Sequence, residues 1–343
     1  MTGAGLIASE QAPADRFDLA LVDLDGVAYR GHEPIPWAAE SILEARGRGL
    51  HVIFVTNNAS REPQTVADQL AALGMPTAAA NVLTAAQAAA GLLATRLSPG
   101  ARVLVVGSDA LRTAVREAGF VVVDSADDHP EAVAQGYGPQ VGWAQLAEAA
   151  YAVAGGAWFV ASNLDLSLPT ERGFAPGNGA LVGAVRAATG VVPDSAGKPE
   201  PSMYRLAVRR AGASAPLVVG DRLDTDLAGA RAADYPGLHV LTGVSSARDD
   251  VLAAPGMRPH LIGADLRALL VPHPCPQPAA EGWWACRGAA ARVTKGVLEL
   301  SAAPDDDPEA RLDLVRAACA SAWEAADDGR PLDPSAVPEL SVE

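Results

Sequence analysis

The chain has 343 residues and a formal net charge of −15 at pH 7. At about 100–200 residues per domain, this length predicts two or three domains. The negative charge excludes nucleic acid as the main partner, because the protein's own field would repel a phosphate backbone. Hydrophobic residues make up 49% of the chain and charged residues 20%, which is typical of a folded globular protein and excludes a disordered one.

The N-terminal segment and the cysteines indicate the compartment. Residues 1–17 lack the pattern of a secretory signal peptide, which is a basic segment followed by an apolar run. We therefore expect a cytoplasmic protein without a membrane span. The cysteines form no CxxC pair and are odd in number, which predicts reduced and mostly buried thiols. They are Cys275, Cys286 and Cys319.

A repeated alternation organises the first 270 residues. Short apolar runs, many of them rich in β-branched residues, are followed by small or polar residues and then by segments with helical periodicity. This order is typical of strand–helix units in a parallel sheet, and it predicts an α/β fold. The expected strands are residues 17–22, 51–55, 102–106, 120–123, 157–161, 217–219 and 238–241.

The pattern changes at the proline-rich segment 271–278. Residues 283–327 favour a hairpin followed by a helix, with the acidic run 305–309 capping the helix. We expect a small α+β appendage in which Trp283, Trp284 and Trp323 contribute to a core and a docking surface. The segment faintly resembles a fragment of an N-acetyltransferase-like domain. It has no convincing glycine-rich loop for coenzyme A, so we expect a structural or dimer-forming role.

The first expected strand ends in the sequence Asp23-Leu24-Asp25-Gly26. Two acids two positions apart at a strand end point to the same side, and Gly26 permits a tight turn. Burying a carboxylate beside an apolar strand is costly unless it has a partner or a function. In such a pair, one acid can act as a nucleophile while the other exchanges a proton. A surface turn rich in Asp and Gly is the alternative at this point.

Polar side chains also follow the second expected strand, in the sequence Thr56-Asn57-Asn58. Open α/β sheets bind ligands at the carboxyl ends of their strands. Hydroxyl, amide and backbone N–H groups suit phosphoryl oxygens, although a turn and a helix N-cap explain the same residues. Lys198 precedes the helix-like segment 202–210, where a solvated surface lysine is the alternative.

A third group of acids follows the strand expected at residues 217–219. Gly220 permits a close backbone approach, and three carboxylates then occur within six residues. Oxygen ligands with no histidine or cysteine nearby favour Mg²⁺. We expect five acids to gather around this cation: Asp23, Asp25, Asp221, Asp224 and Asp226.

Taken together, these motifs resemble those of the haloacid dehalogenase-like phosphatases, and they occur in the same order. The segments LVDLDGVAYRG, VTNN, GKPEPSMY and VVGDRLDTDLAGA look like the subgroup that contains the NagD-type, p-nitrophenyl phosphate, phosphoglycolate and glycerol-3-phosphate phosphatases. The resemblance covers residues 17–271. It implies a Rossmann-like core with a parallel sheet and Mg²⁺-dependent hydrolysis through an aspartyl-phosphate.

The resemblance also implies a role for each matching residue. Asp23 would attack phosphorus, and Asp25 would protonate the leaving oxygen and then activate water. The residues implied for phosphate binding are Thr56, Asn57, Asn58 and Lys198, of which Thr56 and Lys198 would also assist catalysis. The residues implied as direct metal ligands are Asp23, Asp221 and Asp25, the last through its backbone carbonyl. Asp226 would act indirectly, by orienting either metal-bound water or Lys198.

The spacing of the motifs places an inserted domain after the second one. Residues 26–55 number only 30, too few for a folded domain, whereas residues 59–197 number 139. This matches the larger α/β cap, called C2-type, of the superfamily. The cap segment 162–179 resembles the family's substrate-facing loop, which implies substrate contacts by Asn163 and Asp165, and Arg172 is a further candidate. The predicted domains are a discontinuous core at 15–92 and 194–272, a cap at 93–193 and the appendage at 273–343.

The resemblance implies a small phosphorylated metabolite as the substrate. We expect sn-glycerol 3-phosphate, while phosphoglycolate, nucleotides and pyridoxal phosphate remain alternatives. A non-catalytic binding or regulatory protein on the same scaffold is an alternative of another class, and the intact acids and lysine argue against it. We expect neither a nucleic-acid nor a membrane partner, and we expect copies of the chain to associate through the cap or the appendage.

Overall fold

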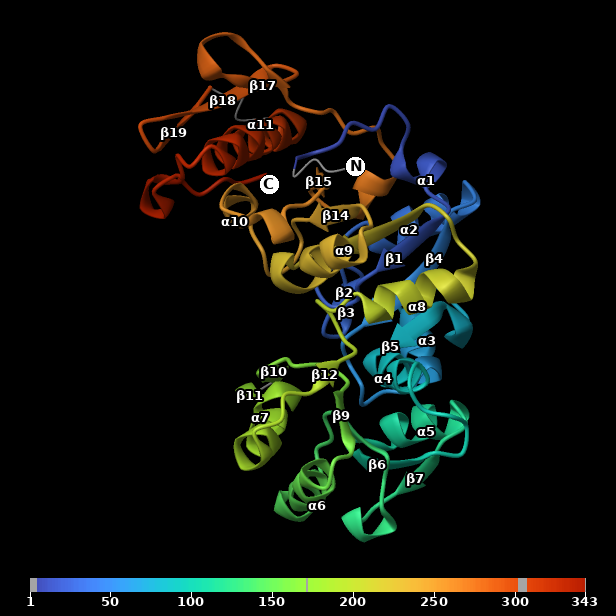
Figure 1. Cartoon of the computed structure of the whole chain (residues 1–343). Helices are drawn as coiled ribbons and strands as arrows, with labels where there is room; N and C mark the ends of the chain where they lie inside the picture. Colours follow the sequence, from blue (N-terminus) through green and yellow to red (C-terminus); the bar gives the residue numbers. More distant parts are fainter. Residues whose placement is uncertain (1–4, 171, 302–306, 343) are drawn as a thin grey trace. The chain divides into compact units, whose positions relative to one another are not determined.

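The computed structural model describes residues 5–170, 172–301 and 307–342 (Figure 1). The chain divides into two compact units. The first comprises Met1–Ile53, Leu73–Met75 and Ala211–Glu343, and the second comprises Phe54–Ala72 and Pro76–Arg210. Strands and helices alternate along most of the chain before the appendage, so the expected α/β class is confirmed.

Parallel strands form the main sheet of the described residues. They are β1 (Leu19–Val22), β4 (His51–Thr56), β5 (Val82–Thr84), β13 (Pro216–Gly220), β14 (Gly237–Val240) and β15 (Leu261–Gly263), in the spatial order β15-β14-β13-β1-β4-β5. In the β1 and β13 pair, Leu19 lies opposite Pro216 and Val22 opposite Val219. Every residue of β1, β13 and β14 is buried, as expected for strands covered on both faces.

Short helices and a hairpin complete the core part of the first unit. Helix α10 begins at Ser246, whose hydroxyl accepts from the Asp249 backbone N–H while the Asp249 carboxylate accepts from the Ser246 N–H, a capping box. The elements are α1 (Pro13–Arg16), β2 (Tyr29–Arg30), β3 (Glu33–Pro34), α2 (Ala38–Gly47), α9 (Ala228–Ala233) and α10 (Ala247–Val251).

A second parallel sheet draws all its strands from residues 102–195 and lies in the second unit. Its strands, in spatial order, are β12 (Asp194–Ser195), β9 (Trp158–Ala161), β8 (Ala132–Gln135), β6 (Arg102–Val106) and β7 (Val121–Val123). Leu104, Val133 and Phe159 pack with Val182 in its core. The helices of this unit are α3 (Pro63–Ala72), α4 (Ala85–Leu93), α5 (Asp109–Glu117), α6 (Trp143–Ala154), α7 (Asn178–Thr189) and α8 (Ser202–Ala211), and the hairpin is β10 (Ser167–Thr170) with β11 (Gly173–Pro176).

The C-terminal appendage is an antiparallel sheet with one long helix, α11 (Pro308–Asp327), lying against it (Figure 1). The strands are β16 (Gln277–Pro278), β17 (Trp284–Cys286), β18 (Ala289–Thr294) and β19 (Val297–Leu300). Cys286 and Cys319 are buried in its core, and all three cysteines are free. Asp307 caps α11 by accepting from the backbone N–H groups of Glu309 and Ala310, while residues 305 and 306 of the acidic run lie outside the described residues.

The appendage packs on the core of the first unit. Trp323 of α11 is 3% exposed and shares a hydrophobic cluster with Val251 of α10 and Ile262 of β15. Trp323 thus lies in a core, as expected, whereas Trp283 and Trp284 are half-buried. The boundaries of the two compact units differ from those of the predicted domains, so the division into domains stays a prediction. Within the described residues, no helix is both long and apolar enough to cross a membrane.

Candidate functional site

Three aspartates of the first unit form a carboxylate cluster. One oxygen each of Asp23, Asp221 and Asp226 lies within 4.8 Å of the others. Asp23 follows β1 and Asp221 follows β13, and these adjacent parallel strands end at the same edge. Asp226 lies in the π-helical turn Leu223–Leu227. The sheet thus assembles acids that are almost 200 positions apart in the chain.

Backbone groups hold the two buried acids of the cluster in place. Asp221 is 1% exposed and its Oδ2 accepts from the Val244 N–H at 2.7 Å. Asp226 is fully buried, and its Oδ2 accepts from the Arg222 N–H at 3.2 Å. Glycines make this packing possible, because a Cβ on Gly243 would overlap the Asp221 carboxylate and a Cβ on Gly220 would overlap Asp226.

Asp25 differs from the cluster in being exposed. It lies on a tight loop in which the Gly26 N–H donates to the Tyr29 carbonyl at 2.8 Å, and Gly26 has a φ of 83° that favours glycine. The Thr242 hydroxyl donates to the Gly26 carbonyl at 2.6 Å and so ties this loop to the segment after β14. An exposed carboxyl on a fixed loop can exchange protons with solvent or with a bound molecule.

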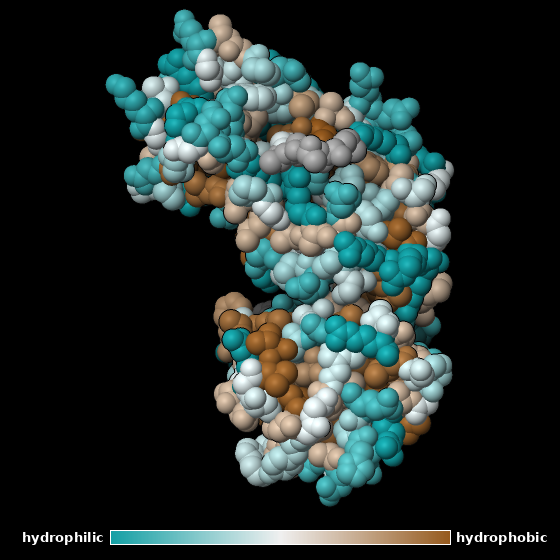
Figure 2. Space-filling view, in the orientation of Figure 1, coloured by the Kyte–Doolittle hydropathy of each residue, from teal (hydrophilic) through white to brown (hydrophobic). Residues whose placement is uncertain are grey.

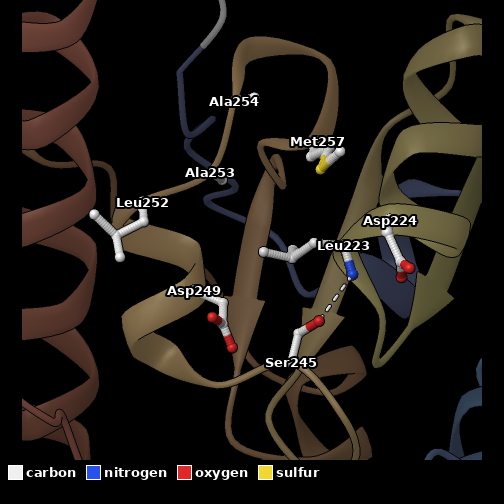
Figure 3. A pocket seen from close by; sticks show the side chains of 8 residues that line it. All are labelled: Leu223, Asp224, Ser245, Asp249, Leu252, Ala253, Ala254 and Met257. Atoms are coloured by element: carbon white, nitrogen blue, oxygen red, sulfur yellow. Dashed lines mark hydrogen bonds between the residues drawn. The ribbon is translucent and has the colours of Figure 1, made fainter. Parts of the chain in front are cut away.

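Asp224 is not part of the carboxylate cluster among the described residues, contrary to expectation. Its carboxylate accepts two hydrogen bonds from the Arg222 guanidinium, at 3.0 and 2.7 Å, and this guanidinium lowers the pKa of Asp224. The reason is helical geometry: residues two positions apart in a helical turn face different sides. Asp224 instead lines a surface pocket of about 350 Å³, where Ser245 binds the Leu223 N–H (Figure 3).

In the second unit, Asn57 and Lys198 form a reciprocal bridge. The Lys198 N–H donates to Asn57 Oδ1 at 2.8 Å, and Asn57 Nδ2 donates to the Lys198 carbonyl at 3.1 Å. Lys198 is only 5% exposed, and its Nζ lies 3.5 Å from the Val55 carbonyl. The side-chain amide of Asn57 therefore orients the lysine, a role that its position in the motif did not indicate.

Thr56 and Asn58 stand beside this bridge and shape the turn after β4. The Thr56 hydroxyl accepts from the Asn58 N–H at 3.1 Å, and Asn58 Oδ1 accepts from the Ser60 N–H at 2.7 Å. Thr56 is 5% exposed. The turn contains short-range hydrogen bonds of the kind that Asn and Thr side chains form with nearby backbone groups.

The loop after β9 brings Asn163 and Asp165 to the Asn57–Lys198 bridge. Asn163 Nδ2 donates to the Asn57 carbonyl at 2.8 Å, and Asn57 Nδ2 also lies 3.3 Å from Asp165 Oδ2. Buried Asn178 supports this loop by donating to the Asn163 carbonyl at 2.7 Å. The sequence motifs did not predict this role for the Asn178 side chain.

Arg172 lies apart from these residues, on the turn of the β10–β11 hairpin. It is exposed and lines an open surface pocket together with Thr170 and Phe174. Within the described residues, this places Arg172 on a hairpin surface rather than in the loop that holds Asn163 and Asp165.

A buried histidine–aspartate pair that the sequence motifs did not predict supports the carboxylate cluster. His239 Nε2 donates to the Asp221 carbonyl at 3.1 Å, and its Nδ1 lies 2.8 Å from Asp250 Oδ2. Burial by itself would lower the pKa of His239, but the adjoining Asp250 carboxylate raises it. No motif contains these two residues, so only the fold brings them together.

Family comparisons match three parts of the chain. Residues 20–121 match the haloacid dehalogenase-like hydrolase family, and residues 195–269 match a second family of similar hydrolases. Residues 286–340 match the GCN5-related N-acetyltransferase-like domain. The first two matches contain the carboxylate cluster, and the third lies within the predicted appendage.

Individual relatives extend these matches over most of the chain. D-glycerol 3-phosphate phosphatase of Mycobacterium tuberculosis is 46% identical over 320 residues, which cover 91% of this chain and 87% of the relative. Acid sugar phosphatase of Staphylococcus saprophyticus is 39% identical over 66% of this chain and 87% of its own length. The crystal structure of glycerol phosphate phosphatase from Mycobacterium tuberculosis in complex with magnesium matches with a TM-score of 0.83 at 46% identity, covering 92% of this chain and 93% of the other.

Proposed function

The chain belongs to the haloacid dehalogenase-like hydrolases, and we propose that it is a Mg²⁺-dependent phosphatase that hydrolyses glycerol 3-phosphate to glycerol and phosphate. The carboxylate cluster carries this proposal. Three acids gathered at one edge of the sheet repel one another, which is costly in a buried site unless a cation neutralises them. The family resemblance expected from the motifs is confirmed.

The residues of the cluster fit Mg²⁺. Asp23, Asp221 and Asp226 offer only carboxylate oxygens, which Mg²⁺ prefers over nitrogen or sulfur. Glycines at positions 26, 220 and 243 leave the carboxylates closely packed. When bound, Mg²⁺ would offset the negative charge of the phosphoryl group and of the attacking oxygen.

The chemistry follows from Asp23 and Asp25. An Asp23 oxygen attacks phosphorus and forms a new P–O bond while the bond to the alcohol oxygen breaks. Asp25 donates its proton to that leaving oxygen, which gives glycerol. Water then attacks the aspartyl-phosphate as Asp25 takes one of its protons, which releases phosphate and restores both acids. The exposure of Asp25 supports this exchange of protons.

The family resemblance assigns the binding of phosphoryl oxygens to Lys198 and Thr56, and the lysine would offset their charge. The Asn57 side chain would act mainly through Lys198, since its amide forms the reciprocal bridge with that residue. Its contact with phosphate, and that of Asn58, would then be made by backbone N–H groups, which bind phosphoryl oxygens well.

Similarity favours glycerol 3-phosphate over the alternative substrates. The phosphatase named for that substrate matches 91% of this chain, including the appendage, whereas the acid sugar phosphatases match about two thirds. Among the cap residues, Asp165 and Asn163 are the proposed neighbours of the glycerol hydroxyls, since both reach the Asn57–Lys198 bridge. Arg172 is a weaker candidate because it stands on the hairpin turn.

We also propose that copies of the chain associate with one another through the second unit. Leu166 is 73% exposed and Phe174 is 83% exposed, both near or on the β10–β11 hairpin. Figure 2 shows hydrophobic side chains gathered over this region. Light scattering of the wild type and of Phe174→Ser tests this point.

Phosphate release from a panel of esters, with Mg²⁺ and with EDTA, tests the function. The panel contains glycerol 3-phosphate, phosphoglycolate, a sugar phosphate, a nucleoside monophosphate and pyridoxal phosphate. We expect Asp23→Asn to lower kcat by roughly 10³-fold or more, because it removes the nucleophile. Asp224→Asn is the matched control, since this acid lies outside the cluster and should retain most of the activity. Activity in EDTA, or in Asp23→Asn, would contradict the mechanism.

A further inference from the structure

A buried chain of hydrogen bonds connects the carboxylate cluster to the appendage. His239 donates to the Asp221 carbonyl at 3.1 Å and binds the Asp250 carboxylate at 2.8 Å. Trp323 Nε1 of α11 donates to the Asp250 carbonyl at 2.9 Å. All four residues are at most 3% exposed, so water does not compete for these bonds.

The carbonyl that His239 binds belongs to Asp221, the first residue after β13. It also accepts from the Ser245 N–H at 3.1 Å. The next carbonyl, of Arg222, accepts from the Asp226 N–H at 3.0 Å and so starts the π-helical turn that carries Asp226. Fixing the first carbonyl therefore orients two acids of the cluster at once.

Burying the His239–Asp250 pair costs free energy, which indicates that the pair has a role beyond filling space. β14 is entirely buried, and an apolar residue at position 239 would pack there without desolvating an imidazole and a carboxylate. The two ring nitrogens of His239 face two different acceptors, which fixes the ring plane.

The appendage holds the far end of the chain of bonds. Helix α10, which carries Asp250, packs against α11. Arg258 is 1% exposed, lies 5.4 Å from the Trp323 ring centre, and binds the Asp327 carboxylate at 2.7 and 2.8 Å. Both contacts anchor the part of α11 from which Trp323 reaches Asp250.

We propose that His239 and Asp250 are positioning residues that hold Asp221 in its metal-binding position, and that Trp323 of the appendage supports them. The inference rests on the proposed Mg²⁺ site and adds a determinant of its affinity. The appendage then contributes to the metal site through three hydrogen bonds and without supplying a ligand.

Calorimetric titration of Mg²⁺ into the substrate-free protein tests this inference, with kcat and KM measured in parallel. We expect His239→Leu to weaken Mg²⁺ binding by about 10–100-fold, the usual effect of losing a partner of a metal ligand. At saturating Mg²⁺, kcat should recover to within about threefold of wild type, since the reacting groups are unchanged. His239→Gln keeps a donor near the position of Nε2 and should restore much of the affinity.

His273→Leu is the matched control. His273 is 3% exposed, lies in the same unit and binds a backbone carbonyl, that of Ala268, at 2.8 Å. We expect this variant to lose stability in thermal unfolding but to keep the Mg²⁺ affinity of the wild type. Trp323→Phe, which removes only the Nε1 donor, should weaken Mg²⁺ binding by about threefold and remains informative if His239→Leu fails to fold.

Two outcomes separate the inference from the proposed function. Wild type that binds no Mg²⁺ in the titration would contradict the proposed cofactor and, with it, the positioning role. If the wild-type protein and the folded variants His239→Leu and Trp323→Phe all bound Mg²⁺ with the same affinity, that result would contradict the positioning role alone.

Discussion

The carboxylate cluster of the first unit and the Asn57–Lys198 bridge of the second are built by different means. In the cluster, buried acids are held by backbone N–H groups and by glycines that leave no space around them. In the bridge, a side-chain amide binds the backbone of the lysine on both sides. The first arrangement tolerates no added atom, whereas the second depends on one amide group. The two regions should therefore fail in different ways.

Adding a single methyl group should break the cluster. The Cβ of Gly243→Ala would overlap the Asp221 carboxylate, which must then leave its position in the cluster. We expect Mg²⁺ affinity to fall by at least about 10-fold and the free energy of unfolding by about 1–3 kcal/mol. Gly256→Ala is the control, because a Cβ there meets no atom within 4 Å. Equal Mg²⁺ affinities in the two variants would contradict the close packing.

Removing the amide should disable the bridge and leave the cluster intact. We expect Asn57→Ala to lower kcat by about 10-fold, because Lys198 loses two hydrogen bonds of about 0.5–1.5 kcal/mol each. Mg²⁺ affinity in the substrate-free protein should stay within twofold of wild type. Gln64→Ala, which removes an exposed amide from α3 of the same unit, is the control. A large loss of Mg²⁺ affinity in Asn57→Ala would show that the two regions are not independent.

The appendage provides the mildest test, since the Asp327 carboxylate, which pairs with buried Arg258, is itself half-exposed and not enclosed like the acids of the cluster. The hydrogen bond from Arg258 lowers the pKa of Asp327, so the pair stabilises the fold above the unfolded pKa of about 4 and loses this effect as pH falls through the lowered value. Because Asp327 is 48% exposed, we expect Asp327→Asn to cost only about 0.5–1 kcal/mol at pH 7.

Urea unfolding at pH 7 and at pH 3 measures this difference, which should shrink at the lower pH. Asp328→Asn, whose carboxylate pairs with exposed Arg330, is the control and should have a smaller effect at pH 7. A difference for Asp327→Asn that grows as the pH falls would contradict the assigned direction of the pKa shift.

Sequence patterns predicted the longer strands well because a buried parallel strand needs a continuous apolar run. The strands that escaped prediction are short or end in polar groups. β5 and β15 have three residues each, and β8 ends in Gln135, which is buried. A run of three apolar residues occurs as often in a helix or a loop, so periodicity does not distinguish it.

The acids of the site were predictable for a different reason, since Asp23 and Asp221 stand directly after strands and the other acids follow them within a few residues. What escaped prediction depends on contacts between distant residues. Asn57 and Lys198 are 141 positions apart, and His239 reaches Asp221 across 18. Asp224 shows the converse, because its position among the acids predicted membership of a cluster from which the π-helical turn removes it.

The discontinuous first unit has a consequence for folding during synthesis. β1 leaves the ribosome well before its partner β13, which follows about 200 residues later in the chain. Trp323, which supports Asp250, emerges 73 residues after it. Domains of nascent chains generally fold as units once they have emerged. The carboxylate cluster can therefore form only after β13 has been synthesised, about 200 residues after Asp23.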